Sequence, residues 1–245
     1  MKGIINYKNL TQFAYSNDKI CEQPIRGIVL SFPGLGWQEM YSEDSKSGKY
    51  YAEHGIIYIV PFNNPWSWMN RQAVSYTNEV IDVIISYYHL PYNIPIVSTG
   101  GSMGGQSALA YMLYAQRTPI ACVVNCPVCD MLFHYTERND LPRTLYSAFY
   151  YENNLEEALK SVSPIHQVDH MPYASYYIFQ CEKDEAVSKE KHSDVLVREL
   201  SRNHDVTYHV VAERGHCDLP EAMKDLFKEY VIEAINCFFH SWYNL

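Results

Sequence analysis

The chain of 245 residues is long enough for one large domain, and its composition excludes several classes of protein. Hydrophobic residues make up 47% of the chain and charged residues 19%, which excludes a disordered chain and a long solvated coiled coil. The net charge of -9 provides no basic surface for phosphate backbones or anionic membranes. We therefore expect no nucleic-acid partner and no membrane partner.

The sequence shows no segment that would direct the chain into or across a membrane. Residues 1–9 have no uninterrupted apolar core for a signal peptide, and no run approaches the roughly 18 apolar residues that span a bilayer. The seven cysteines are an odd number without a secretion signal, which is typical of buried thiols in a reducing compartment. We predict a cytoplasmic protein without cofactors, and the sequence leaves its oligomeric state open.

Short runs rich in Val, Ile and Tyr alternate with longer amphipathic stretches along the chain. In chain order, the predicted strands are 25–32, 56–60, 94–99, 120–125, 175–181 and 206–211. The predicted helices are 40–53, 71–88, 104–117, 188–203 and 220–242. This alternation predicts a single α/β domain over residues 1–245, with a mostly parallel sheet and helices on both of its faces.

The interval 127–172 does not fit the alternation, because it is too long for an ordinary connection between strands and is rich in aromatic residues. We interpret it as a helical cap insertion over the C-terminal edge of the sheet, where open α/β sheets bind their ligands. The alternative is a peripheral helical insertion that packs against a side of the sheet.

A G-x-S-x-G motif occupies Gly100 to Gly104, directly after the strand 94–99 and directly before an Ala- and Leu-rich helix. A strand that turns sharply into a helix strains its central residue and projects that side chain, while flanking glycines avoid collisions. Ser102 is therefore the predicted nucleophile. The alternative is a glycine-rich turn without chemistry.

A serine hydroxyl is a weak nucleophile until an imidazole can accept its proton, and that imidazole needs an orienting carboxylate. His216 is the best placed of the ten histidines, on a polar loop after the strand 206–211. Histidines in the predicted strands and helices are expected to be surface or packing residues. His134, His166 and His170 lie in the insertion, where a role facing the substrate stays open.

Two aspartates compete for the role of the orienting acid. Asp184 lies on the loop that follows the strand 175–181, and Asp130 lies just beyond the neighbouring strand 120–125. Both suit the chain order Ser, then Asp, then His. Asp184 is the preferred acid because of the local motif described below.

The tetrahedral intermediate also needs two backbone N–H donors directed at its oxyanion. One predicted donor is Met103, which follows the nucleophile. The other is Leu35, in the glycine-containing turn Phe32-Pro33-Gly34-Leu35 at the end of an earlier strand. The same turn is also a plausible tight connection with no further role.

These residues together resemble the α/β-hydrolase superfamily over nearly the whole chain from Ile25 onward. Residues 182–187, EKDEAV, are similar to the acid loop of the prolyl oligopeptidase-related and dienelactone hydrolase-like branches. The segment 163–165, SPI, is similar to the one that precedes their acid strand. The resemblance implies that Ser102, Asp184 and His216 act as nucleophile, acid and base.

The resemblance extends to the oxyanion donors and to the N-terminus. It implies Leu35 and Met103 as donors, although Phe32-Pro33-Gly34 stands where many members have a histidine before glycine. It also implies two leading strands before Pro24. Oligopeptidases of this branch carry a large additional domain for which 245 residues leave no room, so size favours an esterase.

We accordingly predict a metal-independent serine hydrolase that cleaves carboxylic esters through an acyl-enzyme, with a small-molecule ester or a short peptide as its substrate. A serine peptidase or aminopeptidase with the same triad is one alternative. A non-catalytic binding protein that retains the fold is another.

Aromatic residues near the expected site predict a wall for an apolar acyl or alcohol group. The alternative is that these rings pack the insertion onto the body of the domain. The candidates are Trp37, Trp66, Trp68, Phe133, Tyr146 and Phe149.

The spacing of Cys126 and Cys129 is like that of thioredoxins, but a single C-x-x-C is weak evidence for redox chemistry, and we expect two buried thiols. Cys126, Cys181 and Cys217 all fall near C-terminal strand ends. A metal site close to the serine is conceivable there, and we expect none.

Overall fold

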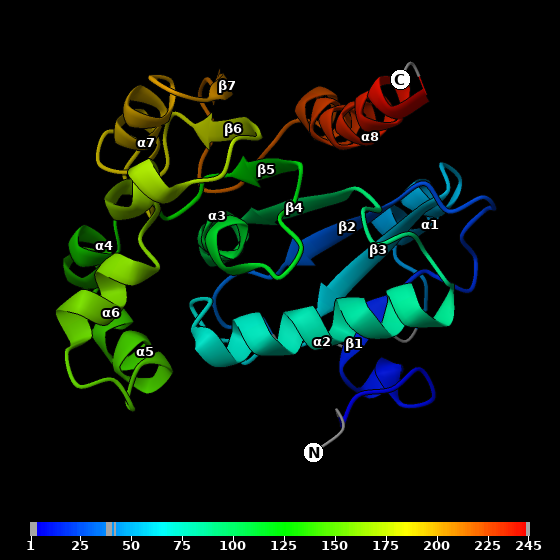
Figure 1. Cartoon of the computed structure of the whole chain (residues 1–245). Helices are drawn as coiled ribbons and strands as arrows, with labels where there is room; N and C mark the ends of the chain where they lie inside the picture. The colour runs from blue at the N-terminus through cyan, green and yellow to red at the C-terminus, as the bar shows by residue number, and fades with distance from the viewer. Residues whose placement is uncertain (1–3, 38–40, 42, 244–245) are drawn as a thin grey trace.

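A seven-stranded sheet forms the centre of the molecule in this computed structural model, which describes residues 4–37, 41 and 43–243 (Figure 1). The strands follow the order β1-β3-β2-β4-β5-β6-β7, and only β1 is antiparallel to its neighbour. This arrangement confirms the predicted α/β class. The strand bounds are β1 Ala14–Ser16, β2 Gly27–Phe32, β3 Ile56–Pro61, β4 Ile96–Gly101, β5 Ala121–Asn125, β6 Ser175–Cys181 and β7 Asp205–Val211.

Helices cover both faces of the sheet, which explains why β3 and β5 are buried along their whole length. Side chains of α2, α3 and α7 form one hydrophobic core with the sheet, and side chains of α1 and α8 form the other. The helix bounds are α1 Lys46–Ala52, α2 Arg71–Tyr87, α3 Met103–Tyr114, α7 Ser193–Leu200 and α8 Glu221–Tyr243.

Three expectations about local structure are corrected. Helix α1 begins at Lys46 because the Ser45 hydroxyl caps it by accepting the Gly48 N–H at 2.9 Å; the expected start at Met40 lies outside the described residues. The described residues before Pro24 form one strand, β1, and a short 3-10 turn, η1 (Leu10–Gln12), instead of two strands. The helix expected over 188–203 is shorter, since residues 189–192 form turns before α7.

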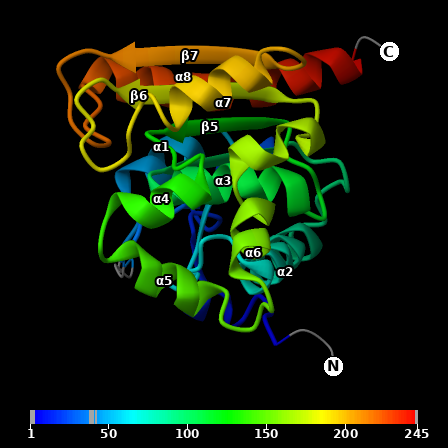
Figure 2. The ribbon, with the colours of Figure 1, turned by 90° about the vertical axis from the view of Figure 1, so that its left-hand side faces the viewer.

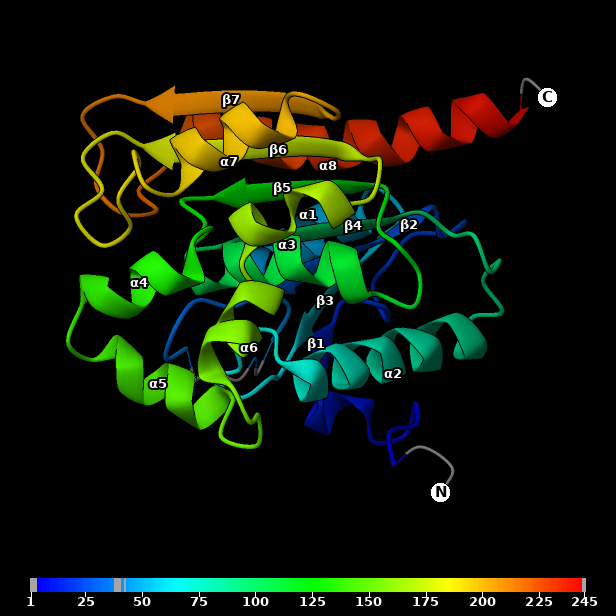
Figure 3. The ribbon, with the colours of Figure 1, turned by 60° about the vertical axis from the view of Figure 1, so that its left-hand side comes forward.

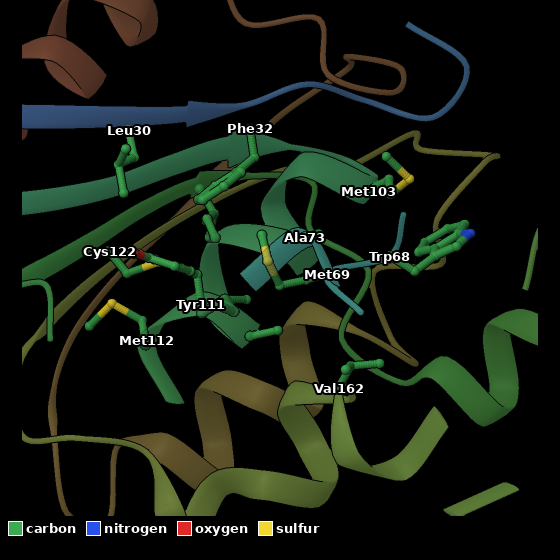
Figure 4. Packing of buried hydrophobic residues seen from close by; sticks show 14 of the residues in the cluster. Leu30, Phe32, Trp68, Met69, Ala73, Met103, Tyr111, Met112, Cys122 and Val162 are labelled. Atoms are coloured by element: carbon green, nitrogen blue, oxygen red, sulfur yellow. The ribbon is translucent and has the colours of Figure 1, made fainter. Parts of the chain in front are cut away.

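The insertion 127–172 is helical, with α4 Met131–Glu137, α5 Leu141–Ala148, α6 Leu155–Ser161 and the 3-10 helix η2 Pro164–His170. In Figures 1 and 3, α4 and α5 lie on the left, the side to which the arrowheads of β5 and β6 point. In Figure 2, α4 and α5 lie toward the front left, and the arrowheads of β6 and β7 again point to the left. The Gln106 amide of α3 donates to the Val162 carbonyl at 2.7 Å. In Figure 4, Met69 and Tyr111 lie between Phe32 of the sheet and Val162 of the insertion. The insertion is thus packed onto the α3 side of the body.

Across residues 4–37, 41 and 43–243, none of the helices has both the length and the apolar character that crossing a bilayer requires.

Candidate active site

Ser102 occupies the sharp turn between β4 and α3 and has a φ of +57° and a ψ of -126°. This conformation is strained for a residue with a side chain, so the surrounding structure must impose it. A Cβ on Gly100 would lie 2.2 Å from the Gly104 carbonyl oxygen, and one on Gly104 would lie 2.0 Å from the Phe32 carbonyl oxygen. Only glycine fits at these two positions, which is the physical reason for the G-x-S-x-G pattern.

Asp184 and His216 meet although they are far apart in the sequence. His216 Nδ1 lies 2.7 Å from Asp184 Oδ2, and the aspartate side chain is fully buried whereas 28% of the imidazole side chain is exposed. Asp184 Oδ1 accepts the N–H groups of Ala186 and Val187, each at 2.9 Å. The backbone of the acid loop therefore holds this carboxylate in place.

The electrostatics of the pair favour an ion-pair-like hydrogen bond. Burial alone would raise the pKa of Asp184, but the hydrogen bonds from His216 and from the Val187 N–H outweigh it and lower that pKa. Burial likewise tends to lower the pKa of His216, whereas the Asp184 hydrogen bond and charge raise it above 6.5 overall. Because an ionised carboxylate only accepts, Nδ1 carries the hydrogen and Nε2 of the neutral ring keeps its lone pair.

The competing acid, Asp130, has different hydrogen-bond partners. Its Oδ1 accepts the N–H groups of Leu132 and Phe133 at 3.0 Å each, which makes it the N-cap of α4. Within the described residues, the His216 ring is hydrogen-bonded to Asp184 and not to Asp130.

Asn125, at the end of β5, connects the serine turn with the histidine loop. Its carbonyl oxygen accepts the Ser102 N–H at 3.0 Å, and its Nδ2 donates to the Cys217 carbonyl at 3.2 Å. The Cys217 Sγ lies 3.6 Å from the Asn125 carbonyl oxygen and 3.7 Å from His216 Nε2. Asn125 and Cys217 thus connect the backbone of Ser102 with the ring of His216, and no hydrogen bond joins Ser102 Oγ to His216 within the described chain.

Two backbone N–H groups near Ser102 have no hydrogen-bond partner in the part of the chain that the structure describes. Met103 is the first residue of α3, where N–H groups have no acceptor within the helix. The Leu35 N–H bonds to no acceptor among the described residues. The close approach of Gly104 to the carbonyl oxygens of Phe32 and Pro33 holds the turn of Leu35 against the serine turn.

The aromatic candidates separate into two groups. Trp68 is fully buried and its indole N–H donates to Thr144 Oγ1 at 3.0 Å, while Phe149 is 5% exposed. Trp68 therefore packs the insertion onto the body, the alternative that the sequence left open for these rings. Phe149 contributes to a separate cavity of about 700 Å³ between α2 and α6. Trp37, Trp66, Phe133 and Tyr146 are half-buried or exposed, and their role stays a prediction.

A second cluster joins two histidines to Glu137 beneath the insertion. His192 Nδ1 accepts the N–H groups of Cys129 and Asp130, both at 3.0 Å, so its hydrogen lies on Nε2 and is donated to Glu137 Oε2 at 3.0 Å. His134 also bonds this carboxylate. In this tautomer Nε2 carries the hydrogen and has no free lone pair, so the neutral His192 ring cannot bind a metal through it. The cluster therefore fits a buried structural network. His134 is a buried member of this network.

Sequence reasoning missed the residues that position the loops, Asn125 and Gln180. Gln180 Nε2 donates to Asp184 Oδ2 at 3.3 Å, and its Oε1 accepts the Ser193 hydroxyl at 2.7 Å. Both residues are polar, buried and at or near the C-terminal end of an apolar strand. A polar residue at the C-terminal end of an apolar strand was the sequence signal that could have identified them.

The strand order, the strained serine after β4 and the loops beyond β6 and β7 define the α/β-hydrolase class. The family model for the prolyl oligopeptidase family matches residues 79–245. The chain therefore belongs to the prolyl oligopeptidase family, which makes it a serine hydrolase of the α/β-hydrolase type. No curated protein sequence matches it significantly.

Solved structures similar to this chain include both esterases and peptidases. An S-formylglutathione hydrolase from Agrobacterium tumefaciens has a TM-score of 0.68 at 14% identity. The match covers 91% of this chain and 88% of the hydrolase chain. Esterase B from Lactobacillus rhamnosis has a TM-score of 0.66 at 12% identity, covering 91% and 80%. A puromycin-hydrolyzing peptidase from Mycobacterium tuberculosis has a TM-score of 0.63 at 15% identity. The match covers 80% of this chain but 31% of the peptidase chain. At these identities the likeness shows the fold.

Proposed function

We propose that this protein is a carboxylesterase whose triad consists of Ser102, His216 and Asp184. The observation that carries the proposal is the 2.7 Å bond between His216 Nδ1 and Asp184 Oδ2, beside a strained Ser102. This bond leaves the lone pair on Nε2, the nitrogen that must accept a proton for a serine to attack.

In the proposed mechanism the Ser102 oxygen forms a bond to the acyl carbon as its proton passes to His216 Nε2. The carbonyl oxygen becomes an oxyanion that accepts hydrogen bonds from the N–H groups of Met103 and Leu35. His216 then returns the proton to the leaving alcohol as the C–O bond breaks. Water repeats the sequence on the acyl-enzyme and releases the acid.

For the proton transfer, the imidazole must exchange its contact with Cys217 Sγ for one with Ser102 Oγ. Catalytic hydrogen bonds are often long in structures without substrate, and they shorten when a substrate is bound. His216 lies on a half-buried loop with Gly215 directly before it, which allows such an adjustment.

The extent of the similarity supports an ester over an amide as the substrate. The chain matches most of the length of the S-formylglutathione hydrolase and of esterase B, but about a third of the puromycin-hydrolyzing peptidase. The proposed location is cytoplasmic, supported by the absence of disulfides among the described cysteines.

The second candidate is a serine peptidase with the same triad, favoured by the match to the prolyl oligopeptidase family. Short aryl esters and the corresponding peptide anilides, assayed side by side, separate the two. A kcat/KM for the anilide that equals or exceeds that for the ester identifies a peptidase.

A serine-directed fluorophosphonate tests the nucleophile independently of the substrate. The wild type is expected to be labelled at Ser102, and the Ser102→Ala variant is expected to remain unlabelled. Cys237→Ser, an exposed site on α8, is the matched control and should be labelled like the wild type. Equal labelling of the wild type and Ser102→Ala would end the proposal.

A further inference from the structure

Two thiols lie beside His216 on the side that faces the serine turn. The Sγ atoms of Cys126 and Cys217 and a ring nitrogen of His216 all lie within 4.8 Å of one another. Cys217 Sγ lies 3.7 Å from His216 Nε2. A tetrahedral zinc ion, with Zn–S bonds of about 2.3 Å and Zn–N bonds of about 2.0 Å, would separate these atoms by roughly 3.5 to 3.8 Å. The cluster therefore needs only a small contraction to hold such an ion.

The imidazole is already oriented as in a metal site. Asp184 holds the Nδ1 hydrogen at 2.7 Å, so the Nε2 lone pair points toward the thiols. A carboxylate that fixes the other nitrogen of a ligating histidine is the usual outer partner of zinc ligands. The His192 cluster is the internal contrast, because its backbone partners place the hydrogen on Nε2.

Two backbone N–H groups point at the sulfur of Cys126, although its contact with the Cys217 thiol and its burial together raise the pKa of its own thiol. Its sulfur accepts the N–H groups of Cys181 at 3.3 Å and of Cys217 at 3.4 Å, which stabilise negative charge on sulfur. Cys217 adopts a φ of +58°, and this turn directs both its N–H and its thiol toward the cluster. Two sulfurs and one imidazole are a donor set that selects a soft or borderline ion such as Zn²⁺.

One member of the cluster, Cys217, lines a cavity. Cys217, Gly101 and Asn125 line a cavity of about 310 Å³ that extends between the sheet and the helices α1 and α8. His216 and Cys217 are half-buried, and Cys126 lies fully buried behind them. An ion entering from the cavity meets Cys217 before Cys126.

We propose that Cys126, Cys217 and His216 form an inhibitory Zn²⁺ site that competes with catalysis for the Nε2 lone pair. Binding forms two Zn–S bonds and one Zn–N bond and releases the protons of the two thiols to solvent. Water takes the fourth position of the tetrahedron. The binding stands on the cluster alone, and the inhibition rests on the proposed role of His216 as the base.

Direct metal binding tests the site without reference to activity. Full-length protein, kept reduced with a phosphine, is titrated with Zn²⁺ against a chromogenic chelator. We expect the wild type to bind one Zn²⁺ per chain. The Cys217→Ser variant should bind Zn²⁺ about 100-fold more weakly or worse, because losing a ligand costs more than losing an outer partner, which costs roughly 10- to 100-fold. Asp184→Asn, which removes that partner, should weaken the binding by about 10- to 100-fold. Cys237→Ser is the control and should bind as the wild type does.

Cobalt supplies a spectroscopic readout of the ligands in the wild type, with the cysteine variants as a comparison. Co²⁺ in the wild type should give thiolate-to-metal charge-transfer absorption in the near ultraviolet and intense visible bands of tetrahedral geometry. Both signals should be lost in Cys126→Ser and Cys217→Ser chains whose circular dichroism matches the wild type. No Zn²⁺ binding by the wild type, unchanged affinity in Cys217→Ser, or Co²⁺ bound without the charge-transfer band would each overturn the site.

Ester hydrolysis then tests the competition. Zn²⁺ should inhibit the wild type over the concentration range in which it binds, and a chelator should restore activity. Cys217→Ser, compared with its own rate without metal, should need about 100-fold more Zn²⁺. An active enzyme that binds Zn²⁺ with no loss of rate would exclude His216 as a ligand. A protein without hydrolase activity that still binds Zn²⁺ would instead refute the proposed function and leave the metal site standing.

Discussion

Asp184–His216 and Glu137–His192 both join a carboxylate to an imidazole, but they do so through opposite ring nitrogens. His216 bonds its acid through Nδ1, whereas His192 bonds its acid through Nε2 because two backbone N–H groups occupy Nδ1. The first pair lies on half-exposed loops beyond the sheet, and the second is buried between the insertion and α7. The comparison teaches that the partner of one nitrogen decides whether the other is free for chemistry.

Replacing each histidine with glutamine gives the largest expected difference between the clusters. His216→Gln should lower kcat/KM for an aryl ester by about 10,000-fold or more, because the base is lost. His192→Gln should keep kcat/KM within about tenfold of the wild type, since this ring only supports packing. Steady-state kinetics on folded protein measures both. A similar loss in the two variants would remove the proposed distinction.

The two candidate acids offer the next comparison. Asp184→Asn should lower kcat by about 10,000-fold, because an amide no longer stabilises the required tautomer and the imidazolium. Asp130→Asn should have little effect, since asparagine is as good an N-cap as aspartate. The reverse order of effects would identify Asp130 as the acid.

The pH dependence of the reaction sharpens the assignment of the base. Only the neutral ring accepts a proton, so kcat/KM should rise about tenfold per pH unit and level off above the pKa of His216. That pKa is raised above 6.5 by Asp184, whereas burial lowers it, so the rising limb of Asp184→Asn should lie at lower pH than that of the wild type. Rates measured between about pH 5 and pH 9 test this. If the rising limb of the pH profile lies at the same pH in Asp184→Asn and in the wild type, the pairing of Asp184 with His216 would be contradicted.

The smallest effect concerns stability. Glu137→Gln should lower the free energy of unfolding by about 1 to 3 kcal/mol, because the buried His134 and His192 lose a charged acceptor. These histidines hold the pKa of Glu137 below 4.5 in the folded state, so the advantage of the wild type is present above that pH and shrinks as the pH falls. Thermal unfolding at neutral and acidic pH measures it. An unchanged melting temperature at neutral pH would exclude a stabilising role for this cluster.

Much of the fold and part of the site could be predicted from the sequence. Each of the six predicted strands is present, because continuous apolar runs between turn residues mark strands buried on both faces. The motif Gly100 to Gly104 located the strained serine, because the close approach of backbone at both glycines permits no side chain. The start of α1 was missed, because its capping serine lies inside the amphipathic stretch and the pattern alone does not show where the first turn forms.

The aromatic side chains show what the sequence left undecided. Trp66 and Trp68 are two residues apart on one loop, yet Trp66 is 39% exposed and Trp68 is fully buried. The local sequence does not distinguish the two residues, but the Trp68 indole bonds Thr144, 76 residues later, and packs against His134. A contact over that distance leaves no local pattern.

The sequence by itself determined the order of strands and helices, the strained serine and the short list of acids and bases, because these depend on local backbone preferences and apolar periodicity. Only the tertiary structure decided which acid meets which imidazole, and it did so through Asn125, Gln180 and the backbone N–H groups around Asp184. It also brought Cys126 beside Cys217, 91 residues away in the chain. Hydrogen bonding and ligand geometry depend on separations of a few ångströms, and only the folded sheet brings distant strand ends to such separations.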